Sequence, residues 1–451
     1  TWPSYTQLHA PSQVMRILVL GSGAREHALA ARFASEPTVS HVICAPANAG
    51  IARTVASAPV DLLDTAAVIR LVDQERIDLT VVGPEGPLAN GLADRFEAEG
   101  RRVFGPTRAA AQLETSKAFA KDFMHRHAVP TARYRVCTSA AEALRAIRAG
   151  EFGDALVVKA DGLAAGKGVV VAADRATAEQ AVHAAMVDKT FGDAGASVVL
   201  EELLSGPEVS FFVVANGAEY VPLLSAQDHK RIFDDDRGPN TGGMGAFSPS
   251  PLMTEALQSR IEREIVQPVL NGMAAEGNPF RGFLYCGLML TPDGPKVIEF
   301  NVRFGDPEAQ VVLPLLDSLA PLLVAVSGSG IREPGTGLSG SPVPGPGSRR
   351  VAVGVVLAAH GYPGGVRTGD AIHGLDDVAR DCPDVQLRFA GVKQQGDALV
   401  TSGGRVLTVV ATAPSFAIAI ARAYEAASKI KFDGMQYRRD IGKNALRAST
   451  P

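Results

Sequence analysis

Apolar and polar positions along the first hundred residues predict strands that alternate with helices. Short apolar runs at 16–20, 42–44 and 79–82 have the length of buried strands, and an alanine-rich helical segment follows the first run to about Ala34. Strands separated by helices form parallel sheets, whose ligands bind at the carboxyl ends of the strands. A polar loop follows each run, so we expect the three loops to meet at one edge of a sheet.

The middle of the chain predicts two further modules. A helix at about 116–125 leads to Pro130, which marks a boundary. Beyond it we expect a small α+β module with strands at 155–159, 169–172 and 198–200 and a helix at 178–186. A larger module from about 203 to 326 contains apolar strands at 209–214, 283–290 and 296–300.

The pattern changes again toward both ends. Residues 327–348 are rich in Gly, Pro and Ser and cannot bury enough apolar area to fold, so we expect a flexible linker. Strands at 351–357 and 405–411 and a helix at 413–430 then predict a last domain. Residues 1–14 show no periodicity before Met15 opens the first apolar run, and we interpret them as a tail foreign to the fold.

Composition narrows the class of protein. The chain has 451 residues, of which 46% are hydrophobic and 20% charged, which is typical of a globular protein with about three domains. Its 44 basic and 48 acidic residues give a net charge of −4, which argues against nucleic acid as the main partner. No apolar run approaches the roughly 18 residues of a membrane span. The four cysteines lack metal-ligand spacing and indicate a reducing compartment, the cytoplasm.

The turn at 21–26 (GSGARE) is the first candidate site. It joins a strand to a helix, so backbone N–H groups at the helix N-terminus could bind an anion such as phosphate. Three interpretations stay open: a structural tight turn, a phosphate site for a small substrate, and a nicotinamide cofactor site. Glu26 at the third glycine position, and the lack of an acidic residue at the end of the second strand, disfavour the nicotinamide cofactor.

A second glycine-rich loop lies at 159–169 (KADGLAAGKGV). Glycines let a backbone approach phosphate oxygens, and Lys159 and Lys167 could balance their charge. The loop is not the usual phosphate-binding loop, because a strand follows it and no Ser or Thr follows Lys167. A glycine-rich hairpin with solvated lysines is the alternative.

Acidic residues at two strands complete the candidate chemistry. Glu201 and Glu202 follow an apolar strand and could be surface residues, or they could border an adenine, with Glu208 on its ribose. Strand alternation at 296–303 puts Glu299, Asn301 and Arg303 on one face, and oxygen ligands beside a cation suit Mg²⁺ that holds a polyphosphate. A half-exposed edge strand is the alternative there.

A long polar loop at 227–231 and 238–246 interrupts an apolar region, as functional loops do. His229 within it is by itself a poor candidate for a base. Together with the motifs at 21–27, 159–169 and 299–308, this loop makes the chain resemble the phosphoribosylamine–glycine ligases (glycinamide ribonucleotide synthetases) of the ATP-grasp superfamily. The resemblance extends from Met15 to about Gly442.

The resemblance implies an α/β chain with the ATP-grasp fold. It implies an N-terminal parallel-sheet, substrate-binding domain at 15–115, an ATP-grasp domain at 116–326 with a small mobile lid at about 132–204, and a C-terminal α/β domain at 349–442. The implied reaction has two steps in de novo purine biosynthesis. The glycine carboxylate attacks the γ-phosphate of ATP, and the amine of 5-phosphoribosylamine then attacks the resulting glycyl phosphate.

The family's roles carry over to matching positions. Arg303 and Asp228 would be catalytic, Arg303 by stabilising charge over the acyl phosphate and Asp228 by orienting an amine. Glu299 and Asn301 would ligate Mg²⁺ or Mn²⁺. The resemblance places these residues on ATP: Lys117, Lys159, Gly162, Gly166, Lys167, Gly168, Glu201, Glu202, Leu204 and Glu208. It places these on phosphoribosylamine or glycine, together with Asp228 and Arg303: Gly21, Gly23, Arg25, Glu26, Asn48 and Glu85.

Three positions depart from the family pattern. Ala24 and Ala47 stand where glycine is expected, and Val302 stands where a small residue is common. Other interpretations stay open: another ATP-grasp carboxylate–amine ligase, such as an aminoimidazole ribonucleotide carboxylase subunit; a non-catalytic nucleotide sensor; and a nicotinamide oxidoreductase. We expect a cytoplasmic monomer whose partners are the small-molecule substrates, with neither nucleic acid nor membrane among them.

Overall fold

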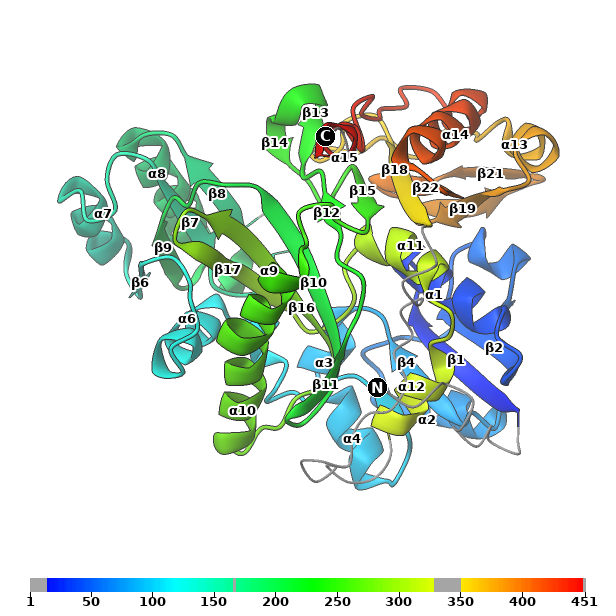
Figure 1. The fold of residues 1–451 in the computed structure, drawn as a ribbon, viewed down its shortest axis with the longest axis horizontal. Helices are drawn as coiled ribbons and strands as arrows, with labels where there is room; N and C mark the ends of the chain where they lie inside the picture. The colour runs from blue at the N-terminus through cyan, green and yellow to red at the C-terminus, as the bar shows by residue number, and fades with distance from the viewer. Residues whose placement is uncertain (1–13, 165–167, 328–349, 449–451) are drawn as a thin grey trace.

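The computed structural model describes residues 14–164, 168–327 and 350–448, and it begins with a five-stranded parallel sheet (Figure 1). The strand order is β3-β2-β1-β4-β5. The strands are β1 (Met15–Gly21), β2 (Val39–Pro46), β3 (Ala56–Ser57), β4 (Leu79–Val82) and β5 (Val103–Phe104). The three predicted strands are therefore present, and their polar loops meet at one edge because all the pairings are parallel.

Helices cover both faces of this sheet, which explains why its strands are apolar throughout. Ile17, Leu18, Val19 and Leu20 of β1 are all fully buried. The helices are α1 (Ala24–Ala34), α2 (Thr65–Gln74), α3 (Glu85–Ala89), α4 (Leu92–Ala98) and α5 (Gln112–Thr115). After them, α6 (Lys117–Arg126) leads into the next module.

A four-stranded antiparallel sheet forms a separate lobe, seen at the left of Figure 1. Its order is β6-β9-β7-β8, and α7 and α8 complete a core of its own. Its elements are β6 (Tyr134–Cys137), α7 (Ala140–Arg148), β7 (Leu156–Ala160), β8 (Val169–Ala172), α8 (Arg175–Val182) and β9 (Val198–Glu202). The predicted helix at 178–186 is thus α8 followed by a π-helical turn at His183–Val187.

A second four-stranded antiparallel sheet, β11-β10-β16-β17, fills the centre of the molecule. Its strands are β10 (Glu208–Asn216), β11 (Glu219–Pro222), β16 (Arg281–Thr291) and β17 (Gly294–Asn301), with α9 (Glu255–Ile261) and α10 (Gln267–Ala275) against them. Its side chains share one hydrophobic core with α2, α4 and α6. The centre and the N-terminal sheet are therefore packed as one body.

The strand β17 corrects one prediction. Gly287 pairs with Glu299 but Leu288 pairs with Val297, so Ile298 is an extra residue in a β-bulge. Strict alternation through 303 is therefore wrong, and Arg303 lies two residues beyond the end of the strand.

The C-terminal sheet draws strands from two distant parts of the chain. Its order is β12-β15-β18-β22-β19, and β12 and β15 come from the polar loop region before residue 250. The strands are β12 (Gln227–Asp228), β15 (Gly245–Ser248), β18 (Val351–Ala358), β19 (Val385–Phe389) and β22 (Arg405–Ala413). The remaining elements are α11 (Glu308–Val312), α12 (Ala320–Val326), α13 (Leu375–Asp381), α14 (Phe416–Lys429), α15 (Lys443–Ala448) and the hairpins β13 (Arg231–Phe233) with β14 (Arg237–Asn240) and β20 (Val392–Gln395) with β21 (Ala398–Thr401).

Some expectations fall outside the described residues, namely the N-terminal tail up to residue 13, the linker from residue 328 and part of the glycine-rich loop (165–167). Over the described ranges, no single helix is long and apolar enough to cross a membrane. One bent pair, Glu308–Leu315 with Ala320–Val326, passes that test on length and composition. Most of its apolar side chains are buried in the core of the fold.

Candidate active site

The turn that begins α1 is filled by one of its own side chains. The Gly23 N–H donates to Glu26 Oε2 at 2.7 Å, and Arg25 Nε donates to Glu26 Oε1 at 2.6 Å. Gly21 has φ +131°, and a Cβ there would lie 2.4 Å from Glu26 Cγ, so the turn requires glycine at this position. Glu26 thus occupies part of the anion position at the helix N-terminus, where a dinucleotide would need open backbone.

Asn48 ties this turn to the C-terminal domain. Its Nδ2 donates to the Ser22 carbonyl at 2.7 Å and to the Phe389 carbonyl of β19 at 2.9 Å. Its Oδ1 accepts from the Gly50 and Ile51 N–H groups. The side chain predicted to face substrate therefore also fixes the sheet edge where substrate would bind.

Arg303 lies between two carboxylates. Its Nε is 3.3 Å from Glu85 Oε2, and its Nη2 is 3.0 Å from Glu114 Oε1. Burial alone would lower the pKa of Arg303, but Glu114 and Glu85 raise it above its ordinary value. Arg303 is therefore a permanent, partly buried positive charge beside the carboxyl edge of the parallel sheet.

Glu114 was not among the predicted site residues. Its Oε2 also accepts from the Val302 N–H at 2.7 Å, so this carboxylate holds both the Arg303 side chain and the backbone beside it. Burial raises the pKa of Glu114 to about 7, although Arg303 opposes the shift. Glu114 lies in the short helix α5 before α6, and nothing in the local sequence shows that it meets residue 303.

Two lysines and a glutamate meet between the β6-β9-β7-β8 sheet of the lobe and the central β11-β10-β16-β17 sheet. Lys159 Nζ donates to the Ile298 carbonyl of the bulge at 2.9 Å and lies 2.8 Å from Glu201 Oε1. Lys121, which the sequence did not indicate, lies 2.9 Å from Glu201 Oε2. Burial would raise the pKa of Glu201, but the two lysines lower it. Glu201 is 3% exposed and belongs to β9, so the alternative of a surface residue is wrong.

Lys117 approaches the glycine-rich loop. Its Nζ donates to the Gly162 carbonyl at 3.0 Å, and burial lowers its pKa. Gly162 and Gly168 are placed at the two ends of this loop, while Gly166 and Lys167 lie outside the described residues. Glu202 pairs with Arg133 at 2.7 Å on the outer side of the lid. Glu202 is therefore not directed into the same cluster as Glu201.

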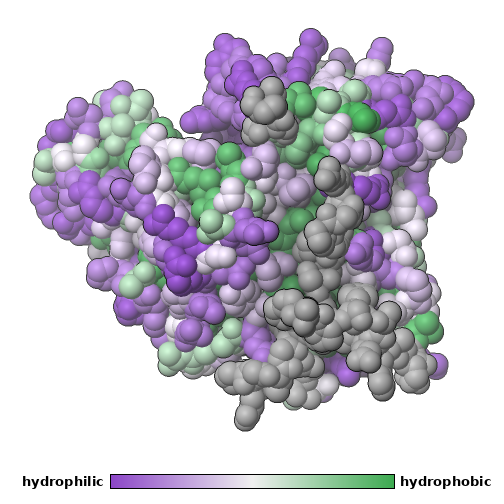
Figure 2. All heavy atoms as spheres, in the orientation of Figure 1, coloured by the Kyte–Doolittle hydropathy of each residue, from purple (hydrophilic) through white to green (hydrophobic). Residues whose placement is uncertain are grey.

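The lid faces the body across an indentation. Figure 2 shows this indentation between the lobe that carries α7 and α8 and the rest of the molecule, with hydrophobic side chains gathered beside it. Exposed large hydrophobic residues of this part of the chain are Leu163, Val171, Val187 and Leu203, and Leu204 adjoins the last of them. An apolar surface beside buried lysines suits a base with a polyphosphate tail.

A buried polar cluster surrounds Asp228. Lys230 Nζ lies 3.7 Å from Asp228 Oδ1 and also forms an ion pair with Glu208. Burial raises the pKa of Asp228 to about 7, and Lys230 opposes that shift. Nearby, Ser210 donates to Glu308 Oε1 at 3.0 Å, and burial raises the pKa of Glu308. Glu208 thus meets a lysine here, and Asp228 lies among groups that could bind an amine.

Glu299 and Asn301 come from the end of β17, next to the bulge. The described residues contain no cluster of three His, Cys, Asp or Glu side chains able to hold a metal by themselves. Mg²⁺ commonly takes only one or two protein oxygens and completes its shell with phosphate and water. This pair fits a metal that arrives with a nucleotide.

Arg405 of β22 joins this region to the C-terminal domain. Its Nη2 lies 3.0 Å from Asp306 Oδ2, and its Nη1 donates to the carbonyls of Asp306 at 2.7 Å and Gly242 at 2.6 Å. One guanidinium therefore connects the segment after Arg303 with the polar loop. Sequence motifs could not reveal it, because its partners lie about 100 and 160 residues away.

Three family profiles match the chain in order. They are the phosphoribosylglycinamide synthetase N domain at residues 15–114, the ATP-grasp (A) domain at 115–309 and the C domain at 352–444. Among individual sequences, the phosphoribosylamine–glycine ligase of Escherichia coli K12 is 47% identical over 439 residues, covering 96% of this chain and 99% of that protein. The ligase of Ralstonia nicotianae is 47% identical and is covered completely, with 96% of this chain aligned.

Solved structures give the same picture. The phosphoribosylamine–glycine ligase of Thermotoga maritima superposes with a TM-score of 0.79 at 33% identity, covering 94% of this chain and 99% of that one. The biotin carboxylase domain of Hydrogenobacter thermophilus 2-oxoglutarate carboxylase, solved with MgADP, superposes at 0.67 with 17% identity, covering 94% and 92%. The second likeness concerns the fold alone.

Proposed function

Because this chain belongs to the phosphoribosylglycinamide synthetase family, we propose that the residues gathered around Arg303, Asp228 and Lys159 form its active site. The activity is ATP-dependent ligation of glycine to 5-phosphoribosylamine, a step of purine biosynthesis. Nearly full-length similarity to the curated ligases carries this conclusion. The roles of individual residues below are our proposal.

Phosphoryl transfer from ATP to the glycine carboxylate needs positioning and charge compensation more than a protein nucleophile. Lys117 and Lys159 supply positive charge near the glycine-rich loop, and Glu201 holds Lys159 in place until the nucleotide arrives. Glu299 and Asn301 would hold Mg²⁺ or Mn²⁺, which neutralises phosphate charge when bound. The adenine lies against the backbone from Glu201 to Leu204.

Arg303 stabilises charge that develops on the acyl phosphate. Glu85 and Glu114 fix its guanidinium before substrate binds, so no reorganisation is needed during the reaction. The amine of 5-phosphoribosylamine then attacks the glycyl carbonyl, with Asp228 orienting it. The loops at Gly21–Glu26, Asn48 and Glu85 face 5-phosphoribosylamine. The enzyme acts as a monomer in the cytoplasm.

The test is ADP release with Mg-ATP, glycine and 5-phosphoribosylamine generated in place, each component being omitted in turn. We expect release only when all are present. Release that ignores glycine but needs another carboxylic acid would retain the fold and overturn the substrate. That outcome would favour another ATP-grasp carboxylate–amine ligase.

The role of Arg303 is tested separately. Arg303→Ala should lower kcat by about 10²–10³ with a smaller effect on the KM for ATP, because a preorganised charge contact acts mainly in the transition state. Arg263→Ala, which removes an exposed arginine that pairs with its neighbour Glu264, is the matched control. An unchanged kcat for Arg303→Ala would contradict the assignment.

A further inference from the structure

The segment that carries Asp228 and Lys230 has two distinct sides. It is extended, since β12 pairs with β15 and the His229 N–H continues that ladder to the Gly245 carbonyl at 2.9 Å. Successive side chains of an extended segment point to opposite sides. Asp228 and Lys230 therefore lie together on the site side, and His229 and Arg231 face the other way.

The C-terminal segment at 438–442 holds that other side. The Gly442 N–H donates to His229 Nε2 at 3.3 Å, which leaves His229 Nδ1 to carry its proton, 4.0 Å from Asp236 Oδ1. Arg438 Nη1 donates to Asp236 Oδ1 at 2.7 Å and to the Arg231 carbonyl at 3.1 Å. The C-terminal segment thus contacts the residue after Asp228 and the residue after Lys230.

Arg438 is the centre of this contact. It is 1% exposed, and its Nε and Nη2 form a two-pronged pair with Asp440 at 2.8 and 2.7 Å. Burial would lower the pKa of Arg438, but its hydrogen bonds to the carboxylates of Asp440 and Asp236 raise it. A charge buried so fully is stable only when its partners hold fixed positions. Arg438, Asp440 and Asp236 therefore form a rigid cluster against which the neighbouring loop is held.

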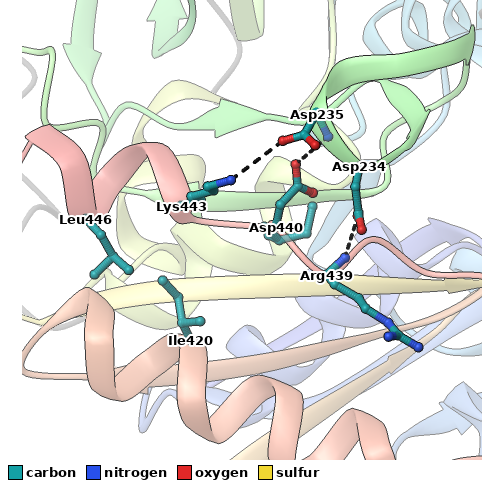
Figure 3. Close-up of a pocket in the computed structure, with 8 residues that line it drawn as sticks. Asp234, Asp235, Ile420, Arg439, Asp440, Lys443 and Leu446 are labelled. Carbon is teal, nitrogen blue, oxygen red and sulfur yellow. Dashed lines mark hydrogen bonds and ion pairs between the residues drawn. The ribbon is translucent and has the colours of Figure 1, made fainter.

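The loop beyond Lys230 has an unusual backbone conformation. Asp235 and Asp236 have φ of +56° and +51°, a left-handed conformation that few residue types other than Gly, Asn and Asp adopt. The Asp235 N–H donates to Asp440 Oδ2 at 2.9 Å, Asp234 Oδ1 accepts from the Arg439 N–H at 2.7 Å, and Lys443 pairs with Asp235 at 3.6 Å. Figure 3 shows these contacts at the rim of an open pocket beside Ile420 and Leu446.

We propose that Arg438 is a positioning residue for the ligase reaction. It acts from the C-terminal domain through Asp236, His229 and the Arg231 carbonyl, and it fixes where Asp228 and Lys230 present their charges. The inference rests on the proposed function, which puts Asp228 beside the attacking amine. Arg438 itself contacts no substrate.

The test is a double-mutant cycle between Arg438→Met and Asp228→Asn, with kcat and the KM for ATP measured for each variant. Arg438→Met should lower kcat by about tenfold or more while the KM for ATP stays within about twofold. In the Asp228→Asn background, the same substitution should cost less than about threefold, because its target is already lost. Arg438→Lys should recover part of kcat.

Asp236→Asn gives a milder version of the same test. Its side chain is 61% exposed, so the variant should fold even if Arg438→Met does not. It should also lower kcat, by less than Arg438→Met does, and this loss should likewise shrink in the Asp228→Asn background. The matched control is Arg422→Met, which removes an arginine of the same domain that pairs with Asp384 and Glu425 away from the loop. Its kcat should equal that of the parent chain.

Equal losses in both Asp228 backgrounds would overturn the positioning role, because they would show a general structural effect. An unchanged kcat in Asp236→Asn, or a loss as large in Arg422→Met, would overturn it as well. If the parent chain itself released no ADP in response to glycine, the proposed function would fail instead.

Discussion

At the scale of single residues, the ionisation of Glu114, which pairs with Arg303, changes with pH in the neutral range. Its folded pKa of about 7 lies above its ordinary value of 4.5, so folding favours the protonated form. Stability from this group is complete below pH 4.5 and is lost as the pH rises through 7. The free energy of unfolding of the parent chain, relative to Glu114→Gln, should therefore fall between these values by at most about 3 kcal/mol.

Urea denaturation of both proteins across this pH range checks the prediction. Glu85→Gln is an informative control because Arg303 and Arg25 lower the pKa of Glu85 against the effect of burial. The parent chain should gain stability relative to Glu85→Gln as the pH rises through the ordinary carboxyl range. This change has the opposite sign to the one expected for Glu114. Parallel curves for the two variants would contradict the assignment of the two carboxylates.

Ala47 occupies a conformation that suits glycine. Its φ is +53°, a left-handed value that costs a residue with a Cβ about 1–2 kcal/mol. The sequence already marked this position as a departure, and the backbone supplies the physical reason. Ala47→Gly should raise the free energy of unfolding by about 0.5–1 kcal/mol after the added flexibility of the unfolded chain is subtracted.

Thermal or urea unfolding tests Ala47→Gly, with Ala421→Gly as the matched change. Ala421 is exposed in the middle of α14, where glycine is unfavourable, so that variant should lose about 1 kcal/mol. The same substitution should thus have opposite signs at the two positions. A loss of stability at both would mean that residue 47 is not strained.

Among individual residues, sequence reasoning found the charged groups whose neighbours formed a motif and missed those whose partners are distant. Arg303 and Lys159 belong to recognisable runs. Glu114 reaches a residue 188 positions later, and Lys121 of helix α6 faces a glutamate on strand β9. The pairing of such residues is created by packing, and no local spacing encodes it.

At the scale of elements, β17 connects strand geometry with the proposed metal site. Its bulge at Ile298 directs a carbonyl to Lys159, and the residues that follow include Glu299 and Asn301. If these two ligate the metal, Glu299→Gln should raise the Mg²⁺ concentration for half-maximal ADP release by about tenfold, since a carboxylate is exchanged for a neutral oxygen.

A magnesium titration of Glu299→Gln at saturating ATP measures this shift. Glu264→Gln removes a carboxylate paired with Arg260 and Arg263 on a helix surface and should leave the titration unchanged. An unchanged curve for Glu299→Gln would place the metal ligands elsewhere.

The bounds of helices and strands were predicted best where a single hydrophobic pattern determines them. β4 and β8 match their predicted bounds because each is a short apolar run between turn residues. The predicted alternation of side chains along β17 was wrong, because a bulge depends on how the partner strand pairs and not on the sequence of β17 alone. The two-residue strand β12 and the four-residue strand β15 carry too few residues for any periodicity, although they complete a sheet.

For the whole molecule, Arg405 connects the C-terminal domain to the centre with three hydrogen bonds. Arg405→Met leaves the Asp306 carboxylate without this partner in a buried setting. It should lower the free energy of unfolding by about 2 kcal/mol and also lower kcat, because Asp306 lies only three residues after Arg303 in the chain.

Unfolding and kinetics measured on the same preparation check this double effect. Arg367→Met removes an exposed arginine that pairs with Asp370 and Asp433 within the C-terminal domain and should cost less than about 1 kcal/mol with kcat unchanged. Equal effects of the two substitutions would show that Arg405 does not link the domains.

The sheet shared between β15 and β18 makes this chain suited to fragment complementation. β15 pairs with β18 from Gly245 to Ser248, so a fragment ending at Ser327 would display an unpaired strand edge. A second fragment starting at Arg350 would supply the missing strand and could restore the sheet by edge-to-edge addition. Glycine-dependent ADP release would then report on whether two proteins fused to the fragments meet, which turns a fold detail into a split-enzyme sensor.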